Sequence, residues 1–196
     1  MRAFIAIEIP AAVRRAAAEA AARLTQVAPG FRVFAAENFH LTLAFLGDIP
    51  DTKISPLTTA LGRALYSWES FSMSLRGAGR FPPRGRPRVA WIGVAEGKDS
   101  CERLARDVGR ACALAGIEAD DKPFHPHLTL GRARDRTRGE GRFDRELSGL
   151  EHWMREQEDK PVGAPFRVER IVLFESALTP KGSIYSERAE VRLGAG

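Results

Sequence analysis

The 196-residue sequence has few cysteines, no long apolar run and neither of the common glycine-rich phosphate-binding loops. Its only cysteines are Cys101 and Cys112, and it contains no Cys-x-x-Cys pair. On one helix, at a rise of ~1.5 Å per residue, they would lie about 16 Å apart, which is too far for a disulfide. We therefore expect two reduced core cysteines, as in a cytoplasmic protein.

The apolar segments are too short for a membrane protein. No stretch approaches the roughly 20 apolar residues that are needed to span a bilayer. The apolar start of the chain is interrupted by Glu8 and Pro10, so we expect no secretory signal. The absence of Gly-x-Gly-x-x-Gly and Gly-x-x-x-x-Gly-Lys leaves no support for a nucleoside triphosphatase.

The composition indicates an ordinary globular protein with an anionic partner. Hydrophobic residues make up 44% of the chain and charged residues 28%. The length of residues 1–196 suits either one compact domain or two small lobes that share a core. A net charge of +5 favours an anionic partner. Arginines gather in two runs, each either a solvated loop or a substrate contact: Arg80, Arg84, Arg86 and Arg88, and Arg132, Arg134, Arg136 and Arg138.

One four-residue phrase occurs twice, as His40-Leu41-Thr42-Leu43 and as His127-Leu128-Thr129-Leu130. In a strand, residues two apart share a face, so each phrase projects a His and a Thr together and turns its leucines to the core. An unperturbed imidazole titrates near ~6.5, so two facing histidines can act as general acid and general base. One copy alone would indicate only a half-buried strand. The duplication favours a catalytic site.

The apolar periodicity predicts alternating strands and helices. The expected strands are Phe4–Ile9, Phe31–Phe34, Phe39–Leu46, Phe71–Arg76, Val89–Val94, Phe124–Arg132, Val168–Phe174 and Ile184–Leu193. The expected helices are Ala11–Val27, Ile54–Leu65, Ser100–Ala115 and Phe143–Met154, and the expected loops are Gly77–Arg88 and Arg134–Gly141. Each half of the chain thus repeats a strand, a helix and a His-x-Thr strand, which indicates an α+β fold. A pseudo-two-fold axis would bring both motif strands to one cleft.

These segments resemble the 2H phosphoesterase superfamily, and more narrowly the RNA 2′,3′-cyclic phosphodiesterases, also called LigT-like or 2′-5′ RNA ligase-like proteins. The residues that carry the resemblance are the two His-x-Thr-x motifs, the opening Phe4-Ile5-Ala6-Ile7, the words Glu37–Gly47 and Arg88–Gly93, and Leu173-Phe174-Glu175-Ser176 followed by Tyr185. The segment Arg134–Lys160 matches no part of this pattern.

The resemblance implies a bilobal fold of two pseudo-two-fold-related lobes, with antiparallel or mixed sheets and outer helices around a central cleft. It implies metal-independent, cofactor-free hydrolysis of an RNA 2′,3′-cyclic phosphate end to a 2′-phosphomonoester, with His40 as the proton donor and His127 as the proton acceptor. Ligation would run the same chemistry in reverse. Thr42 and Thr129 would bind the phosphate. We also expect a monomer that binds no metal and no membrane.

Several residues have two interpretations. Arg132 would lie on the face opposite His127 in a regular strand, reaching phosphate from the strand end or serving the surface. His125 would orient His127 or pack at the cleft edge. Phe45 would stack a base or, more simply, join the core. His152 is expected at the surface.

Three other functions stay open at this stage. A metal enzyme would use His125 and His127 as a ligand pair, with Asp120 and Asp121 available, although no recognised metal spacing emerges. A non-catalytic module would bind RNA in the same basic cleft. A related phosphoesterase would act on a small cyclic nucleotide.

Overall fold

The computed structural model describes residues 1–119, 123–134, 140–179 and 182–194. Its strands are β1 (Arg2–Glu8), β2 (Phe31–Val33), β3 (His40–Asp48), β4 (Phe71–Met73), β5 (Leu75–Phe81), β6 (Val89–Val94), β7 (His127–Ala133), β8 (Phe166–Val168), β9 (Arg170–Thr179) and β10 (Gly182–Arg192). Its helices are α1 (Ala11–Val27), α2 (Ile54–Leu65), α3 (Lys98–Leu114) and α4 (Glu140–Gln157), with short 3₁₀ turns η1 (Ala36–Asn38) and η2 (Asp51–Lys53).

The strands form two larger sheets and one small one. The first has the order β10-β9-β1-β3, the second the order β2-β7-β6-β5, and β4 pairs with β8. All of these pairings are antiparallel. The expected α+β class is confirmed, and the motif strand β3 lies at the edge of the first sheet, whereas the motif strand β7 lies inside the second.

The predicted repeat is present in the strand pairing itself. In the first half β1 pairs with β3 and places Glu8 opposite His40, and in the second half β6 pairs with β7 and places Gly93 opposite His127. Both pairs shift register at the second leucine of the motif, so that Leu43 and Leu130 are each the extra residue of a β-bulge. The two motif strands therefore have the same local geometry.

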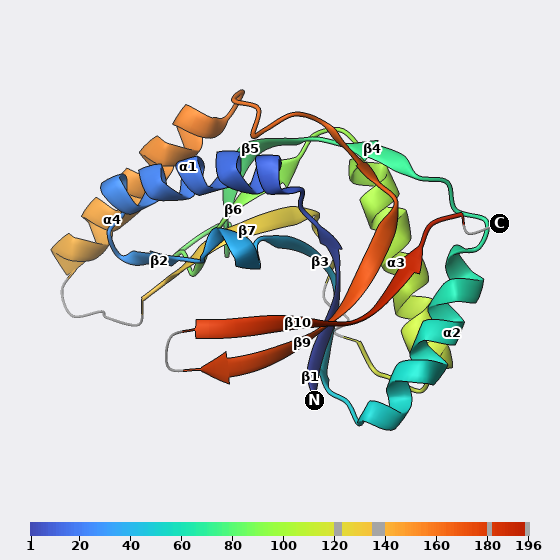
Figure 1. The fold of residues 1–196 in the computed structure, drawn as a ribbon. Coiled ribbons are helices and arrows are strands. Elements are labelled where there is room, and N and C mark those ends of the chain that lie inside the picture. Colours follow the sequence, from blue (N-terminus) through green and yellow to red (C-terminus); the bar gives the residue numbers. More distant parts are fainter. Residues whose placement is uncertain (120–122, 135–139, 180–181, 195–196) are drawn as a thin grey trace.

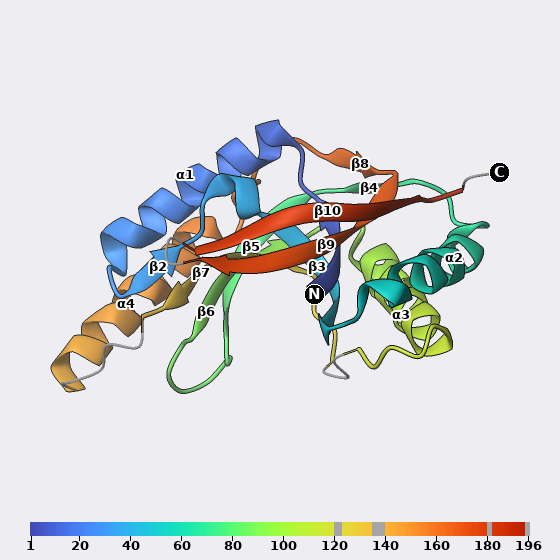
Figure 2. The same ribbon diagram turned by 60° about the horizontal axis from the view of Figure 1, so that its bottom comes forward.

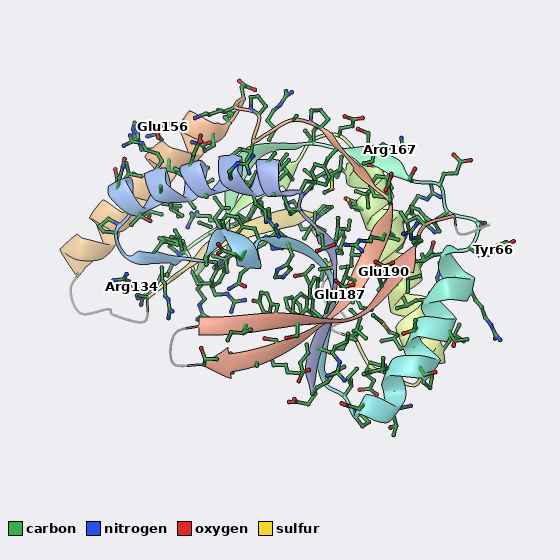
Figure 3. All side chains as sticks on the ribbon, viewed as in Figure 1. Tyr66, Arg134, Glu156, Arg167, Glu187 and Glu190 are labelled. Carbon is green, nitrogen blue, oxygen red and sulfur yellow. The ribbon has the colours of Figure 1, made fainter. Side chains whose placement is uncertain are left out.

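The helices are exchanged between the two halves. Helix α1 follows β1 but packs on β2 and β7 of the second sheet, whereas α3 follows β6 but packs on β3 of the first sheet. Figure 1 shows α1 and α4 together on one side of the molecule and α2 and α3 together on the other. Arg23 of α1 joins Glu156 of α4 at 2.7 Å, where Figure 3 labels Glu156. The two lobes are thereby interlocked.

The motif leucines lie in the shared core as expected. Leu41, Leu128 and Leu130 are fully buried and Leu43 is nearly so. Cys101 and Cys112 are free, buried thiols on α3, and burial raises the pKa of the Cys101 thiol to about 12. Among the described residues, no helix has the length and apolarity that crossing a membrane requires.

The chain between Phe71 and Arg88 differs from the sequence prediction. The single strand expected over Phe71–Arg76 is split between β4 and β5, which belong to different sheets. The expected loop Gly77–Arg88 is wrong over its first part, because β5 continues to Phe81. A Cβ on Gly79 would lie 2.1 Å from the Trp91 indole, so the glycine makes room for a large cross-strand ring instead of marking a turn.

Smaller differences occur at other boundaries. The strand expected over Val168–Phe174 is divided into β8 and β9. Helix α4 begins at Glu140, so the end of the loop expected over Arg134–Gly141 is helical, while residues 135–139 lie outside the described part. Helix α1 has the predicted bounds, and helix α3 begins two residues earlier than predicted. The elements that carry the motifs are therefore confirmed.

Candidate active site

The two motif histidines are held by the same backbone contact. His40 Nδ1 lies 2.7 Å from the carbonyl oxygen of Asn38, and His127 Nδ1 lies 2.6 Å from the carbonyl oxygen of His125. A carbonyl can only accept, so each Nδ1 carries a hydrogen and donates it. In the neutral ring the other nitrogen, Nε2, is then left without a proton. Each histidine thus presents Nε2 for proton transfer.

Aromatic rings fix the orientation of both imidazoles. His40 stacks on Phe4 with 4.6 Å between ring centroids, and Tyr185 meets it edge-on at 5.2 Å. His127 is met edge-on by Phe81 at 5.0 Å and lies 6.0 Å from Trp91. Rings packed in this way limit rotation of the imidazole and keep water from one side of it.

The two histidines differ in their surroundings. Burial, with a smaller contribution from the charge of His127, lowers the pKa of His40 to about 4. Burial also lowers the pKa of His127, but less strongly, and the neighbouring His125 adds to that effect. Both imidazoles are therefore mainly neutral in the free protein near pH 7. The electrostatic coupling of His127 to His40, and the contact of β3 with β7, show that the structure brings the two motifs together.

Thr42 and Thr129 lie two residues after their histidines, and both are partly exposed on the histidine face of the strand. Thr42 is opposite Ala6 and Thr129 is opposite Trp91 in the two equivalent registers. Within the described part of the chain neither hydroxyl is hydrogen-bonded to another residue. Both hydroxyls are available to a ligand.

The bulge places Arg132 differently from the sequence prediction. A regular strand would turn Arg132 away from His127, but the extra residue at Leu130 reverses the alternation. The burial pattern shows this directly, because Leu130 and Gly131 are both buried and Arg132 is exposed on the side of Thr129. The expectation of an opposite face is therefore wrong, and Arg132 shares the face of the catalytic motif.

Phe45 is the counterpart of Arg132 in the first repeat. The same bulge, at Leu43, buries Ala44 and leaves Phe45 exposed over 50% of its surface. Its ring lies 6.2 Å from Phe4, which in turn stacks on His40. The simpler interpretation of Phe45 as a core residue is wrong, and the side chain lies at the edge of the site.

The remaining histidines lie outside this arrangement. The His125 side chain is exposed and contacts the Trp91 ring at 4.9 Å, so it packs at the edge of the site beside His127. His152 lies at the surface as expected, 3.1 Å from Glu156. Asp120 and Asp121 lie outside the described residues, and within the described ranges no three His, Cys, Asp or Glu side chains form a metal-ligand group.

Sequence reasoning missed the rings that hold the histidines. The sequence singles out Phe4, Trp91 and Tyr185 only as part of the segments that carry the family resemblance, and it predicts a loop at Phe81. One signal in the sequence could have found two of them. Phe4 and Trp91 each lie on the strand that comes one helix before a motif strand, and that strand pairs with the motif strand. Tyr185 comes from β10, and no local pattern links it to His40.

Comparison with known proteins identifies the family. The family model described as the 2′-5′ RNA ligase superfamily matches residues 10–179. A curated RNA 2′,3′-cyclic phosphodiesterase of Aeropyrum pernix is 37% identical over 158 residues, which are 80% of this chain and 82% of that protein. The one of Thermotoga maritima is 32% identical over 199 residues, covering 100% of this chain and 97% of that protein.

Solved structures agree with these sequence matches. A crystal structure of a Thermus thermophilus protein superposes with a TM-score of 0.75 at 30% identity, covering 99% of this chain and 98% of that one. The crystal structure of Escherichia coli LigT complexed with 3′-AMP superposes with a TM-score of 0.73 at 26% identity, covering 98% and 97%. With its repeated His-x-Thr strands, shared bulges and bilobal fold, the chain belongs to the 2′-5′ RNA ligase superfamily.

Proposed function

We propose that this protein is an RNA 2′,3′-cyclic phosphodiesterase that opens a terminal cyclic phosphate to a 2′-phosphomonoester without a metal or other cofactor. The observation that carries the proposal is the pair of histidines with equivalent geometry, each anchored through Nδ1 and presenting Nε2. The names of the relatives, at 30–37% identity, support the same reaction.

The reaction requires one proton acceptor and one proton donor on opposite sides of phosphorus. Water attacks phosphorus as His127 Nε2 removes its proton, and the bond from phosphorus to the ribose 3′ oxygen breaks as His40 Nε2 supplies a proton to that oxygen. Each such transfer contributes typically ~10²–10⁴-fold to the rate. The two imidazoles then exchange protons with solvent, and no other reactant is consumed. The reverse, ligating direction exchanges their roles.

The donor role requires His40 to take up a proton from solvent when the anionic substrate binds. Its pKa of about 4 must rise by roughly 3 units for donation near pH 7, which corresponds to about 4 kcal/mol. A negative charge ~4 Å away contributes about 4 kcal/mol at an effective dielectric constant of 20. The charge of the phosphodiester anion is therefore sufficient to raise the pKa of His40 to the range in which it can donate a proton.

The remaining site residues bind the phosphate. Thr42 and Thr129 donate their hydroxyl hydrogens to the nonbridging oxygens, where negative charge grows in the transition state. Arg132, now on the same face, adds a charge-assisted hydrogen bond to that group. We infer further that residues 1–196 act as one interlocked domain and as a monomer, and that the buried, reduced thiols suit a cytoplasmic location.

The test is an assay on a short RNA ending in a 2′,3′-cyclic phosphate, after exhaustive chelation and with the product isomer identified. Wild-type protein is expected to form the 2′-phosphate, and His40→Ala and His127→Ala are expected to lose turnover. His152→Ala is the matched control, because His152 is exposed on α4, and it should keep full activity.

Each contrary result is specific. A 3′-phosphate product would reverse the choice of leaving oxygen. Loss of turnover on chelation would show that the protein is a metal-dependent enzyme. Turnover of 2′,3′-cyclic mononucleotides but not of RNA would assign the site to small cyclic nucleotides. RNA binding without any turnover would leave a binding module.

A further inference from the structure

A groove lies between the β9–β10 hairpin and the strands β2 and β7. Its volume is about 1180 Å³. A drug-sized ligand occupies a pocket of about 300–1,000 Å³, so this groove exceeds what one small molecule needs. A smaller pocket of about 370 Å³ contains His40, and the two share Ala35, Asn38, Ser183, Ile184 and Tyr185. The groove is therefore a continuation of the pocket that His40 lines.

One wall of the groove is basic. Arg32 of β2, Arg132 of β7 and Arg134, which follows β7, all line it. Among its described lining residues there is no aspartate or glutamate, whereas the smaller His40 pocket is also lined by Glu8 and Glu37. A polyanion that extends from the His40 pocket therefore meets positively charged arginines along the larger groove. Figure 3 labels Arg134 just past the end of β7, where it lies next to the start of β2.

The opposite wall is apolar and exposed. Leu178 of β9 and Ile184 of β10 are exposed over 71% and 56% of their surfaces, and both line the groove. In Figure 1 the hairpin lies below β2 and β7 and extends to the same side of the molecule as they do. In Figure 2 it lies in front of them. Asn38 Nδ2 donates to the Ser183 carbonyl at 3.0 Å and ties β10, close to the turn end of the hairpin, to η1. The apolar side chains are thus held over the basic wall.

We propose that this groove binds the nucleotides on the 5′ side of the cyclic phosphate, with their phosphates on the arginine wall and their bases against Leu178 and Ile184. The inference rests on the proposed function, because it needs an RNA end between the two histidines. A chain that ends in a cyclic phosphate continues only through its 5′ oxygen. A basic wall and an apolar wall in one groove match a single strand with its backbone phosphates on one side and its bases on the other.

The experiment compares long and minimal ligands. A fluorescent RNA decamer with an ordinary 3′ hydroxyl reports binding without any chemistry, and kcat/KM is measured for the same decamer with a 2′,3′-cyclic end and for a 2′,3′-cyclic mononucleotide. The variants are Arg134→Ala and Leu178→Ala, since these two side chains line the groove and not the His40 pocket. The control is Arg63→Ala, an exposed arginine of α2 on the far side of the molecule.

Arg134→Ala is expected to weaken decamer binding and to reduce the slope of log affinity against log salt by about 0.7, the value for one phosphate contact to a single strand. Leu178→Ala removes aliphatic surface and is expected to weaken decamer binding about fourfold or more. Both variants should lower kcat/KM for the cyclic decamer and leave the mononucleotide within twofold. Arg63→Ala should change neither.

The groove assignment fails if the variants bind the decamer like wild type, or if they lose decamer and mononucleotide turnover equally. Failure of the proposed function gives a different result. In that case wild type turns over neither cyclic ligand, while the decamer still binds in a way that depends on Arg134 and Leu178.

Discussion

The two halves of the active site share one motif and differ in what surrounds it. Each motif strand has the same register to its partner, the same bulge and the same contact from histidine Nδ1 to the carbonyl two residues earlier. Yet the position after the bulge is Phe45 in one half and Arg132 in the other. The motif therefore provides equivalent imidazoles, and the neighbours give them separate tasks.

The neighbouring sheets add to that difference. Strand β3 is at the edge of its sheet, whereas β7 lies between β2 and β6. Glu8, opposite His40, is engaged by Arg170 at 2.5 Å, and burial is the main cause of the depressed pKa of His40. His127 has Gly93 opposite it and a smaller shift. The first half thus contains the histidine with the more strongly lowered pKa, His40, and the second half contains Arg132.

The largest expected effect comes from removing either imidazole. His40→Ala and His127→Ala should each lower kcat by about 10²–10⁴-fold, because each loses one proton transfer. The double variant should fall short of the product of the two losses, since groups that act as a unit are not additive. Single-turnover rates on the cyclic RNA measure this. A full multiplicative loss would indicate that the histidines act independently.

Lowering the pH should reduce the free energy of unfolding, and His40 should contribute more to this loss than His127. The folded pKa of His40 lies below its unfolded value, so its contribution is present above pH 6.5 and is lost as the pH falls toward 4. The loss amounts to about 3 kcal/mol at 1.36 kcal/mol per pKa unit. Denaturant unfolding at pH 7 and pH 4 should show that His40→Asn removes most of it. His127→Asn should remove less, and equal effects would contradict the difference in burial.

The pair formed by Arg132 and Phe45 tests the different tasks. Arg132→Ala should lower kcat/KM for the cyclic RNA by roughly 10–100-fold, since a hydrogen bond to a charged group contributes about 1.5–3 kcal/mol. Arg132→Lys should restore only part of it, because lysine lacks the planar fork. Phe45→Ala should reduce kcat/KM less. A larger loss for Phe45→Ala would assign the main substrate contact to the first half.

The smallest effect concerns the residue that precedes these two positions. A Cβ on Gly131 would lie 2.7 Å from the Arg32 carbonyl oxygen, so Gly131→Ala pushes β2 from β7 and should destabilise the protein by about 1–3 kcal/mol. Ala44 occupies the equivalent place on the edge strand β3, which has room for a methyl group. Equilibrium unfolding of Gly131→Ala measures this cost. An unchanged midpoint would mean that β2 can move aside.

The sequence by itself determined the two motif strands, the helices between them and the repeat that relates them. The alternation in His-Leu-Thr-Leu places the leucines in the core and the His and Thr at the site. The alanine-rich segment that follows Pro10 predicts α1 with its observed bounds. These features depend on near neighbours in the chain. The identity of the two candidate proton-transfer residues followed from the duplication alone.

Only the tertiary structure decided which further side chains join the site. The bulges at Leu43 and Leu130 turn Phe45 and Arg132 to the histidine face, and a bulge depends on the partner strand more than on the residue itself. Tyr185 reaches His40 from β10, and the exchanged helices interlock the lobes. Such contacts join residues far apart in sequence. Packing between sheets sets them, and local periodicity carries no record of it.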